Sequence, residues 1–220
     1  MATFGKTRLQ IINAVLPRLR ESTVATSSST IYAALIAAIL DSVKTQMESA
    51  WIWRALRDTY TITTVSGTTS YSLTSSGQFA TIIDAWNTTT NRQLAPSTTA
   101  DFNKKFFGVT TVQTGNVSEY NVVGVDANYD LQIDTWPNAT AANTLKINVY
   151  IPQPDPIDSA VILVPNQVLI EGIIAYAIAE RGDDNGVAAQ AQMQLYQAML
   201  GDAIAAEVGA DSSEVDFEPV

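Results

Sequence analysis

Residues 51–65 read WIWRALRDTYTITTV, and this stretch decides the fold because the pattern of side chains changes within it. Before it, apolar residues recur every three or four positions, as they do on one face of a helix. From Thr59 onward almost every residue is β-branched or aromatic, which is typical of a β-strand. The change predicts that a helical segment ends near residue 58 and that a β-segment begins at residue 59.

Two helices are predicted before this point. Residues 6–21 carry leucine and isoleucine at helical spacing, and Pro17 is expected to kink this helix or end it early. Residues 30–57 continue the same spacing over a longer helix, which Ser29 or Thr30 can cap. Neither helix can bury its apolar stripe alone, so both must pack against helices elsewhere in the chain.

Helix returns after the β-segment. Four prolines between residues 152 and 165 end the sheet, because proline cannot donate a hydrogen bond to a ladder. Residues 166–181 are apolar nearly all round, as expected of a buried helix, and residues 187–208 form a last helix. We therefore expect an α+β fold, in which a small antiparallel β-domain of about six short strands is inserted into a helical bundle.

The expected domain boundaries follow from these changes of pattern. The helical bundle comprises residues 1–58 and 165–208, and the inserted β-domain comprises residues 59–151. Residues 152–164 form a proline-rich return linker, and residues 209–220 form an acidic C-terminal tail.

The composition argues against an enzyme. The chain of 220 residues has no cysteine and no histidine, so thiolate metal sites and the commonest general base are excluded. No glycine-rich phosphate-binding motif occurs, and the acidic loop at residues 183–185 lacks the spaced glutamate of a calcium loop. A carboxylate pair could hydrolyse a glycoside, but no spacing selects two of the many acids. We expect no catalytic, cofactor-binding or metal-binding residues.

Charge is unevenly distributed along the chain. Residues 1–110 hold ten Lys and Arg against six Asp and Glu, whereas residues 111–220 hold two against sixteen. Such a separation of charge along the chain indicates interaction surfaces. Acidic loops that only keep the protein soluble explain it equally well. Twelve basic residues in all are too few and too scattered for ordinary nucleic-acid binding. The longest apolar run, residues 31–40, is too short to span a bilayer.

Two groups of residues are candidate interaction sites. Two tryptophans and two arginines lie close together in the sequence where the helical and β-segments join, and they are candidates for a domain seam: Trp51, Trp53, Arg54 and Arg57. An ordinary core anchor with arginine stacking is an alternative explanation of that group. In the acidic tail, apolar and acidic residues alternate as on an extended strand that could dock in a groove: Val215, Asp216, Phe217, Glu218 and Val220.

The order of these segments resembles a known family. A helical start, residues 51–58, a Thr-rich strand and then Tyr71-Ser72-Leu73 are similar to head-to-tail adaptor proteins of tailed bacteriophages. Pro165 and the helix through residues 175–179 continue the likeness, and the layout is also similar to that of tail tubular protein A of short-tailed phages. The resemblance covers about residues 6–205 and rests on layout and a few residues.

The resemblance implies a structural virion protein at the head–tail junction, assembled in the host cytoplasm. It implies a homo-oligomeric, dodecameric ring beneath the portal protein that extends the DNA channel and attaches the next tail or nozzle component. The acidic walls of such a channel would repel DNA phosphates, so that DNA passes through without specific binding. No membrane partner is expected. The acidic tail would then dock on the portal. An alternative that the Thr, Asn and Trp content leaves open is a β-rich tail-fibre or carbohydrate-binding module.

Overall fold

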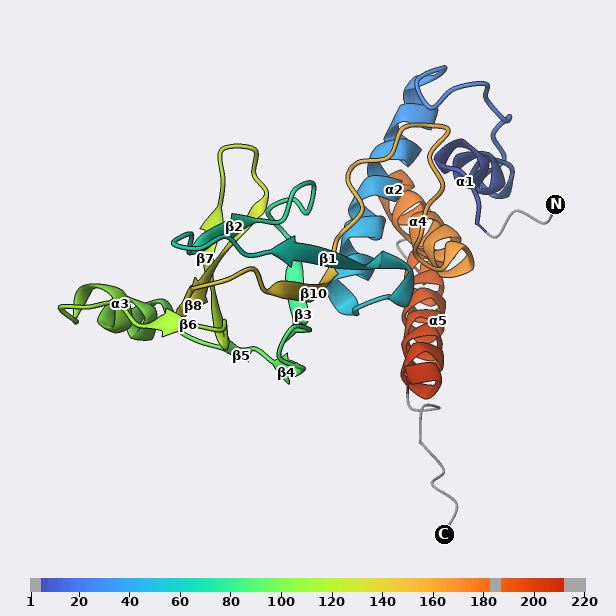
Figure 1. The fold of residues 1–220 in the computed structure, drawn as a ribbon. Helices are drawn as coiled ribbons and strands as arrows, with labels where there is room; N and C mark the ends of the chain where they lie inside the picture. The colour runs from blue at the N-terminus through green and yellow to red at the C-terminus, as the bar shows by residue number, and fades with distance from the viewer. Residues whose placement is uncertain (1–4, 183–186, 212–220) are drawn as a thin grey trace, which may run out of the picture. The chain divides into compact units, whose positions relative to one another are not determined.

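A computed structural model describes residues 5–182 and 187–211 of the chain (Figure 1). Helices and antiparallel and mixed sheets are both present, so the predicted α+β class is confirmed. The chain divides into two compact units. Unit 1 is Met1–Ala55 with Gln153–Val220, and unit 2 is Leu56–Pro152. That each unit is an independently folding domain stays a prediction.

The first helix of unit 1 is short and its ends have clear causes. Helix α1, Arg8–Val15, begins with a capping box, in which Thr7 and Gln10 each donate a backbone N–H to the other's side chain. The 3-10 turn η1, Leu16–Leu19, follows directly, and Pro17 lies in its first turn. Proline cannot supply the N–H of a continuing α-helix, so α1 ends early.

Helix α2, Ile31–Ala50, is the long helix expected after the serine- and threonine-rich loop. The Thr30 side chain accepts from the Ala33 N–H at 3.0 Å and thereby caps the first turn. The helix does not continue to residue 57, because the backbone of Trp51 is extended. The turn η2, Arg54–Leu56, leads from there into the β-segment.

Helix α4, Asn166–Arg181, is the centre of unit 1 and packs against α1, α2 and the last helix, α5, Val187–Asp211. Its glycine explains how two helices approach it so closely. A Cβ at Gly172 would lie 2.8 Å from Val43 of α2 and 2.8 Å from Tyr196 of α5. Helix α5 continues to Asp211, so its last turn includes residues that the sequence assigned to the tail.

The segment 153–165 is held on unit 1 by hydrogen bonds, although it has little regular structure. The Arg8 N–H donates to the Ala160 carbonyl at 2.9 Å, and the Ile162 N–H donates to the Lys6 carbonyl at 3.1 Å. On the other side, the buried Lys44 side chain donates to the Gln153 carbonyl. This return segment is therefore part of the packing of the helices.

Unit 2 contains two four-stranded sheets and a short two-stranded pair. In the first sheet all neighbours are antiparallel, and in the second only β5 pairs in parallel, with β7. The first sheet has the order β1 Arg57–Thr63, β10 Thr144–Tyr150, β3 Thr81–Asn87 and β4 Arg92–Gln93. The second has the order β2 Ser70–Ser72, β8 Leu131–Trp136, β7 Glu119–Val125 and β5 Ala95–Pro96. The parallel pair is β6 Thr114–Gly115 with β9 Asn138–Ala139.

The chain enters and leaves unit 2 on neighbouring strands. Strands β1 and β10 pair along their whole length, and the Ile151 N–H donates to the Leu56 carbonyl at 2.9 Å. One apolar cluster fills the interior, with contributions from β3, β7, β8 and β10. Helix α3, Thr99–Phe107, is a short helix within this unit, and the Thr98 side chain caps it by accepting from the Asp101 N–H.

Buried amides connect the loops at one end of this cluster. Asn87 and Asn143 are fully buried, and the Asn87 amide donates to the Asn143 side chain at 2.8 Å and to the Val117 carbonyl at 2.9 Å. Because buried polar groups are costly when unpaired, these bonds fix the positions of the segments that carry them.

Candidate interaction site

Trp53 is a buried anchor at the end of α2. Its side chain is almost completely buried, and its indole N–H donates to the Met47 carbonyl at 2.8 Å. That carbonyl belongs to the last turn of the helix, where no intrahelical partner is available. The structure therefore gives Trp53 the role of core anchor and helix cap within unit 1.

Arg54 is bonded to the C-terminal helix. Its guanidinium lies 3.1 Å from the Glu207 carboxylate of α5, and its backbone N–H also donates to Glu207 at 3.3 Å. The pair is substantially exposed, so it contributes little to stability and mainly fixes the position of the turn after α2.

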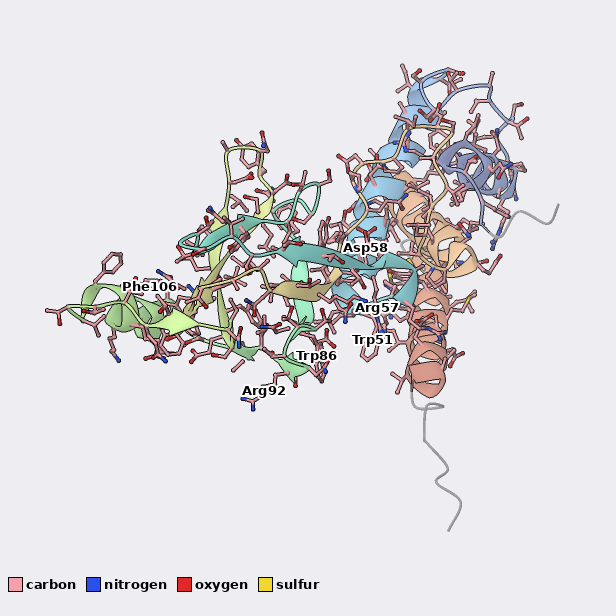
Figure 2. All side chains as sticks on the ribbon, in the orientation of Figure 1. Trp51, Arg57, Asp58, Trp86, Arg92 and Phe106 are labelled. Carbon is pink, nitrogen blue, oxygen red and sulfur yellow. The ribbon has the colours of Figure 1, made fainter. Side chains whose placement is uncertain are left out.

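Trp51 and Arg57 lie on either side of the boundary between the units. Trp51 follows α2 and is partly buried in unit 1, whereas Arg57 is the first residue of β1 in unit 2 (Figure 2). The Trp53 indole thus bonds α2, the Arg54 guanidinium bonds α5, and Arg57 belongs to strand β1 of the first sheet. The role of the four residues as a seam stays a prediction.

The outer face of the first sheet in unit 2 is polar. The Thr59 hydroxyl donates to the Asn148 side chain at 2.6 Å, and the Asn148 amide donates to Asp84 at 2.5 Å. These side chains line an open hollow of about 420 Å³ together with Arg57, Asp58 and Ile83. Trp86, 41% exposed, lies on the same face beside Lys146 of the neighbouring strand (Figure 2).

An ion-pair network that sequence reasoning missed joins three elements of unit 1. Both terminal nitrogens of the Arg18 guanidinium donate to the Glu171 carboxylate, at 2.6 and 2.8 Å, and Gln167 and Gln192 also donate to it. The hydrogen bonds from Arg18 lower the pKa of Glu171 below its ordinary value. In a second pair, Lys44 and Glu48, both side chains are buried and the effect is opposite, since burial raises the pKa of Glu48. No local pattern connects Arg18 with a residue so distant in sequence.

Neither network has the form of a catalytic or metal site. Among residues 5–182 and 187–211, no group of three or more Asp and Glu side chains is arranged to hold a metal ion. The two carboxylates whose pKa is shifted in these networks, Glu171 and Glu48, are bonded to Arg18 and Lys44, so their electrostatics serve packing. Within the same described residues, no helix combines the length and apolar character needed to cross a membrane.

The model of the SU10 adaptor protein family matches residues 6–216. The chain belongs to this family. The match covers nearly the whole sequence and includes both units. No curated protein matches the chain.

The SU10 adaptor family is a family of phage head–tail adaptors, which gives this protein a structural head–tail adaptor role. It is a family of structural proteins and not of enzymes. The predicted resemblance to head-to-tail adaptors is confirmed at this level, whereas the likeness to tail tubular protein A is not.

The second candidate group of this SU10-family adaptor lies outside the described residues. Val215, Asp216, Phe217, Glu218 and Val220 all belong to the segment 212–220. Their proposed docking role rests on the sequence pattern alone.

Proposed function

We propose that this adaptor forms a homo-oligomeric ring, dodecameric as the resemblance implies, beneath the portal protein of the virion. The ring would extend the DNA channel and offer a surface to the next tail or nozzle component, in the manner of tail tubular protein A. The match of the family model to residues 6–216 is the observation that carries this proposal.

The charge distribution supports passage of DNA without binding. Helix α5 carries no basic residue, and its acidic residues are Asp202, Glu207 and Asp211. An acidic surface repels phosphates, so a channel lined by the C-terminal part of this helix would let a genome slide through.

The acidic tail is our candidate for docking on the portal. Val215 and Phe217 would enter a groove from one side of an extended strand, while Asp216 and Glu218 would face basic groups of the partner. The assembled virion neck and the host cytoplasm during assembly are the locations that follow from this role.

Native mass spectrometry of the adaptor, alone and with the portal protein of the same phage, tests the proposal. We expect a complex with one defined number of adaptor copies on each portal ring. Electron microscopy of virions with labelled adaptor should place the label at the neck. A stable trimer that binds glycans and labels the fibre tips would instead support the fibre module and overturn the adaptor ring.

A further inference from the structure

Helix α5 has an outer face that unit 1 leaves largely uncovered. Of the residues in α5 whose side chains the structure describes, Ala189 and Tyr196 are buried. The opposite side carries residues at spacings of three and four, including Val187 at 69% and Leu195 at 45% exposure. This outer face consists of Val187, Ala191, Leu195 and Ala198. The side chains on this face are exposed and mostly apolar, so among the residues that the structure describes none covers it.

Helix α2 has a second uncovered face, and that face carries no charge. It runs from Ile31, which is 93% exposed, along the side of the helix that turns away from α4. The outer face of α2 consists of Ile31, Ala34, Ala38, Ser42, Thr45 and Ser49. The charged residues of this helix lie elsewhere, because Lys44 and Glu48 are buried and Asp41 is paired with Arg8 at 2.7 Å.

The hydroxyl groups on the outer face of α2 are suited to burial. The Thr45 hydroxyl donates to the Asp41 carbonyl, and the Ser49 hydroxyl donates to the Thr45 carbonyl, both at 2.9 Å within the same helix. A hydroxyl that bonds the carbonyl four residues earlier keeps its partner when water is removed. Another helix could therefore cover this face without leaving these donors unpaired.

The two faces are complementary in shape and in charge. Leu195 projects from α5 between small residues, and the middle of the α2 face, at Ala34, Ala38 and Ser42, has only small side chains. Small residues form the grooves into which the side chains of another helix pack. No charged residue lies in α5 between Val187 and Gly201, so the facing surfaces contain no charge to desolvate over that length.

These observations identify the occupant as a second copy of this chain. Two copies that each carry a net charge of −10 repel one another, and they can approach most closely where both surfaces are uncharged. Because α2 and α5 are different surfaces, a contact between them is heterologous, and such contacts repeat around a ring when the rotation closes. We propose that the outer face of α5 in one copy packs against the outer face of α2 in the next copy. This inference rests on the proposed ring.

Disulfide trapping in assembled particles tests the contact, and the absence of native cysteine makes the result unambiguous. Phage that lacks its own adaptor gene would be supplied with two variants at once, one carrying Ala38→Cys and one, with a size tag, carrying Leu195→Cys. Further pairs of cysteine variants combine position 34, 38 or 42 of α2 with position 191, 195 or 198 of α5. These pairs allow for small shifts of one helix along the other. After mild oxidation of purified virions, we expect mixed dimers whose disulfide joins an α2 position to an α5 position. The matched control replaces Ala38→Cys with Ala25→Cys in the exposed loop, and should give none.

Each other outcome has a definite meaning. Dimers of the Leu195→Cys variant with itself would show that α5 pairs with α5 and would overturn the heterologous contact. An adaptor that is present at the neck but forms none of the disulfides would overturn this inference and leave the proposed function intact. An adaptor that is absent from the virion would overturn the proposed function, and this inference with it.

A charge placed in the contact gives an independent measurement. Ala38→Glu puts an unpaired carboxylate on the outer face of α2, and we expect it to lower the number of adaptor copies per virion by more than about tenfold. Ala25→Glu adds the same charge at an exposed position outside the contact and should leave incorporation unchanged. Circular dichroism should show that both variants keep their helices. Equal incorporation of the two variants would contradict the proposal.

Discussion

Trp53 illustrates how one side chain can determine where a helix ends. Its indole donates to the carbonyl of Met47, which would otherwise be left unpaired in the last turn of α2. Trp53→Phe keeps most of the buried ring but removes the donor, so we expect a loss of about 1–3 kcal/mol in the free energy of unfolding. Urea denaturation measures the loss. Trp86→Phe, at an exposed position, is the control, and equal stability of the two variants would contradict the role given to Trp53.

Glu171 should make the stability of unit 1 sensitive to acid. Its pKa is lowered chiefly by the hydrogen bonds from Arg18, so the folded state binds a proton less readily than the unfolded state. The resulting stabilisation is complete above the ordinary pKa of 4.5 and is lost as the pH falls through the lower, folded-state pKa.

Glu171→Gln removes this contribution, so the variant should be less stable than the wild type at pH 7. The difference in unfolding free energy between the two proteins should narrow as the pH falls below about 4.5. Denaturation curves over that pH range measure both effects. Glu180→Gln, at an exposed position, provides the control. A difference that stays constant with pH would mean that Glu171 acts through packing and not through its charge.

At the scale of elements, the close approach of three helices depends on Gly172. In an isolated helix, alanine in place of glycine stabilises by about 1 kcal/mol. Here the added Cβ would lie 2.8 Å from both Val43 and Tyr196, and overpacking of this kind costs about 1–3 kcal/mol. We therefore expect Gly172→Ala to lower the melting temperature, and Val43→Ala in the same chain to restore part of the loss. A higher melting temperature for Gly172→Ala alone would show that the helices move apart at little cost.

The sequence predicted most elements whose signals are local. The change of pattern near residue 59 locates the start of β1 to within two residues, and Pro17 explains the early end of α1. The sequence places the end of α2 too late, because the helical spacing of apolar residues continues through residues 51–57. The hydrogen bond from the Trp53 indole to the Met47 carbonyl, which caps the end of the helix, forms only in the folded chain.

The missed features of the candidate site are distant in sequence or too short to leave a pattern. The pairing of Arg18 with Glu171 joins residues on different elements, and the two-residue strands β6 and β9 carry no alternation. The apolar residues all round α4 indicated that this helix is buried on all sides. The sequence of α5 does not show that one of its faces stays uncovered. That distinction depends on which helix lies at the centre of the unit.

At the scale of the whole molecule, unit 2 is built so that it could fold alone. Its apolar cluster, with the partly buried side chains packed against it, is drawn from residues between Tyr60 and Ile151, and its two ends meet at the pair formed by β1 and β10. We expect residues 56–152, expressed separately, to give a dispersed NMR spectrum and a cooperative unfolding transition. A chain in which a short glycine–serine linker replaces these residues should keep the helical signal of unit 1 in circular dichroism. If neither piece folds, the two units are one cooperative domain and the predicted division fails.

The charge distribution of the whole chain makes the tail the part to test for portal binding. Residues 212–220 contain three acids and three large or branched apolar residues, which suit a groove that is both basic and apolar. Fixing each backbone residue costs about 1–2 kcal/mol, so a partner that orders this segment must supply a comparable free energy. A basic groove on the portal would supply it through ion pairs around Asp216 and Glu218 and through burial of Val215 and Phe217.

Deletion of residues 212–220 should leave the circular dichroism of the subunit unchanged and weaken its assembly onto the portal at physiological salt. Val215→Ala with Phe217→Ala should reproduce most of the loss if burial dominates, whereas Asp216→Asn with Glu218→Gln should do so if charge dominates. Salt separates the two cases, because only the charge contribution is screened at high ionic strength. A truncated chain that joins the portal as well as the full chain does, at physiological salt, would overturn the docking role of the tail.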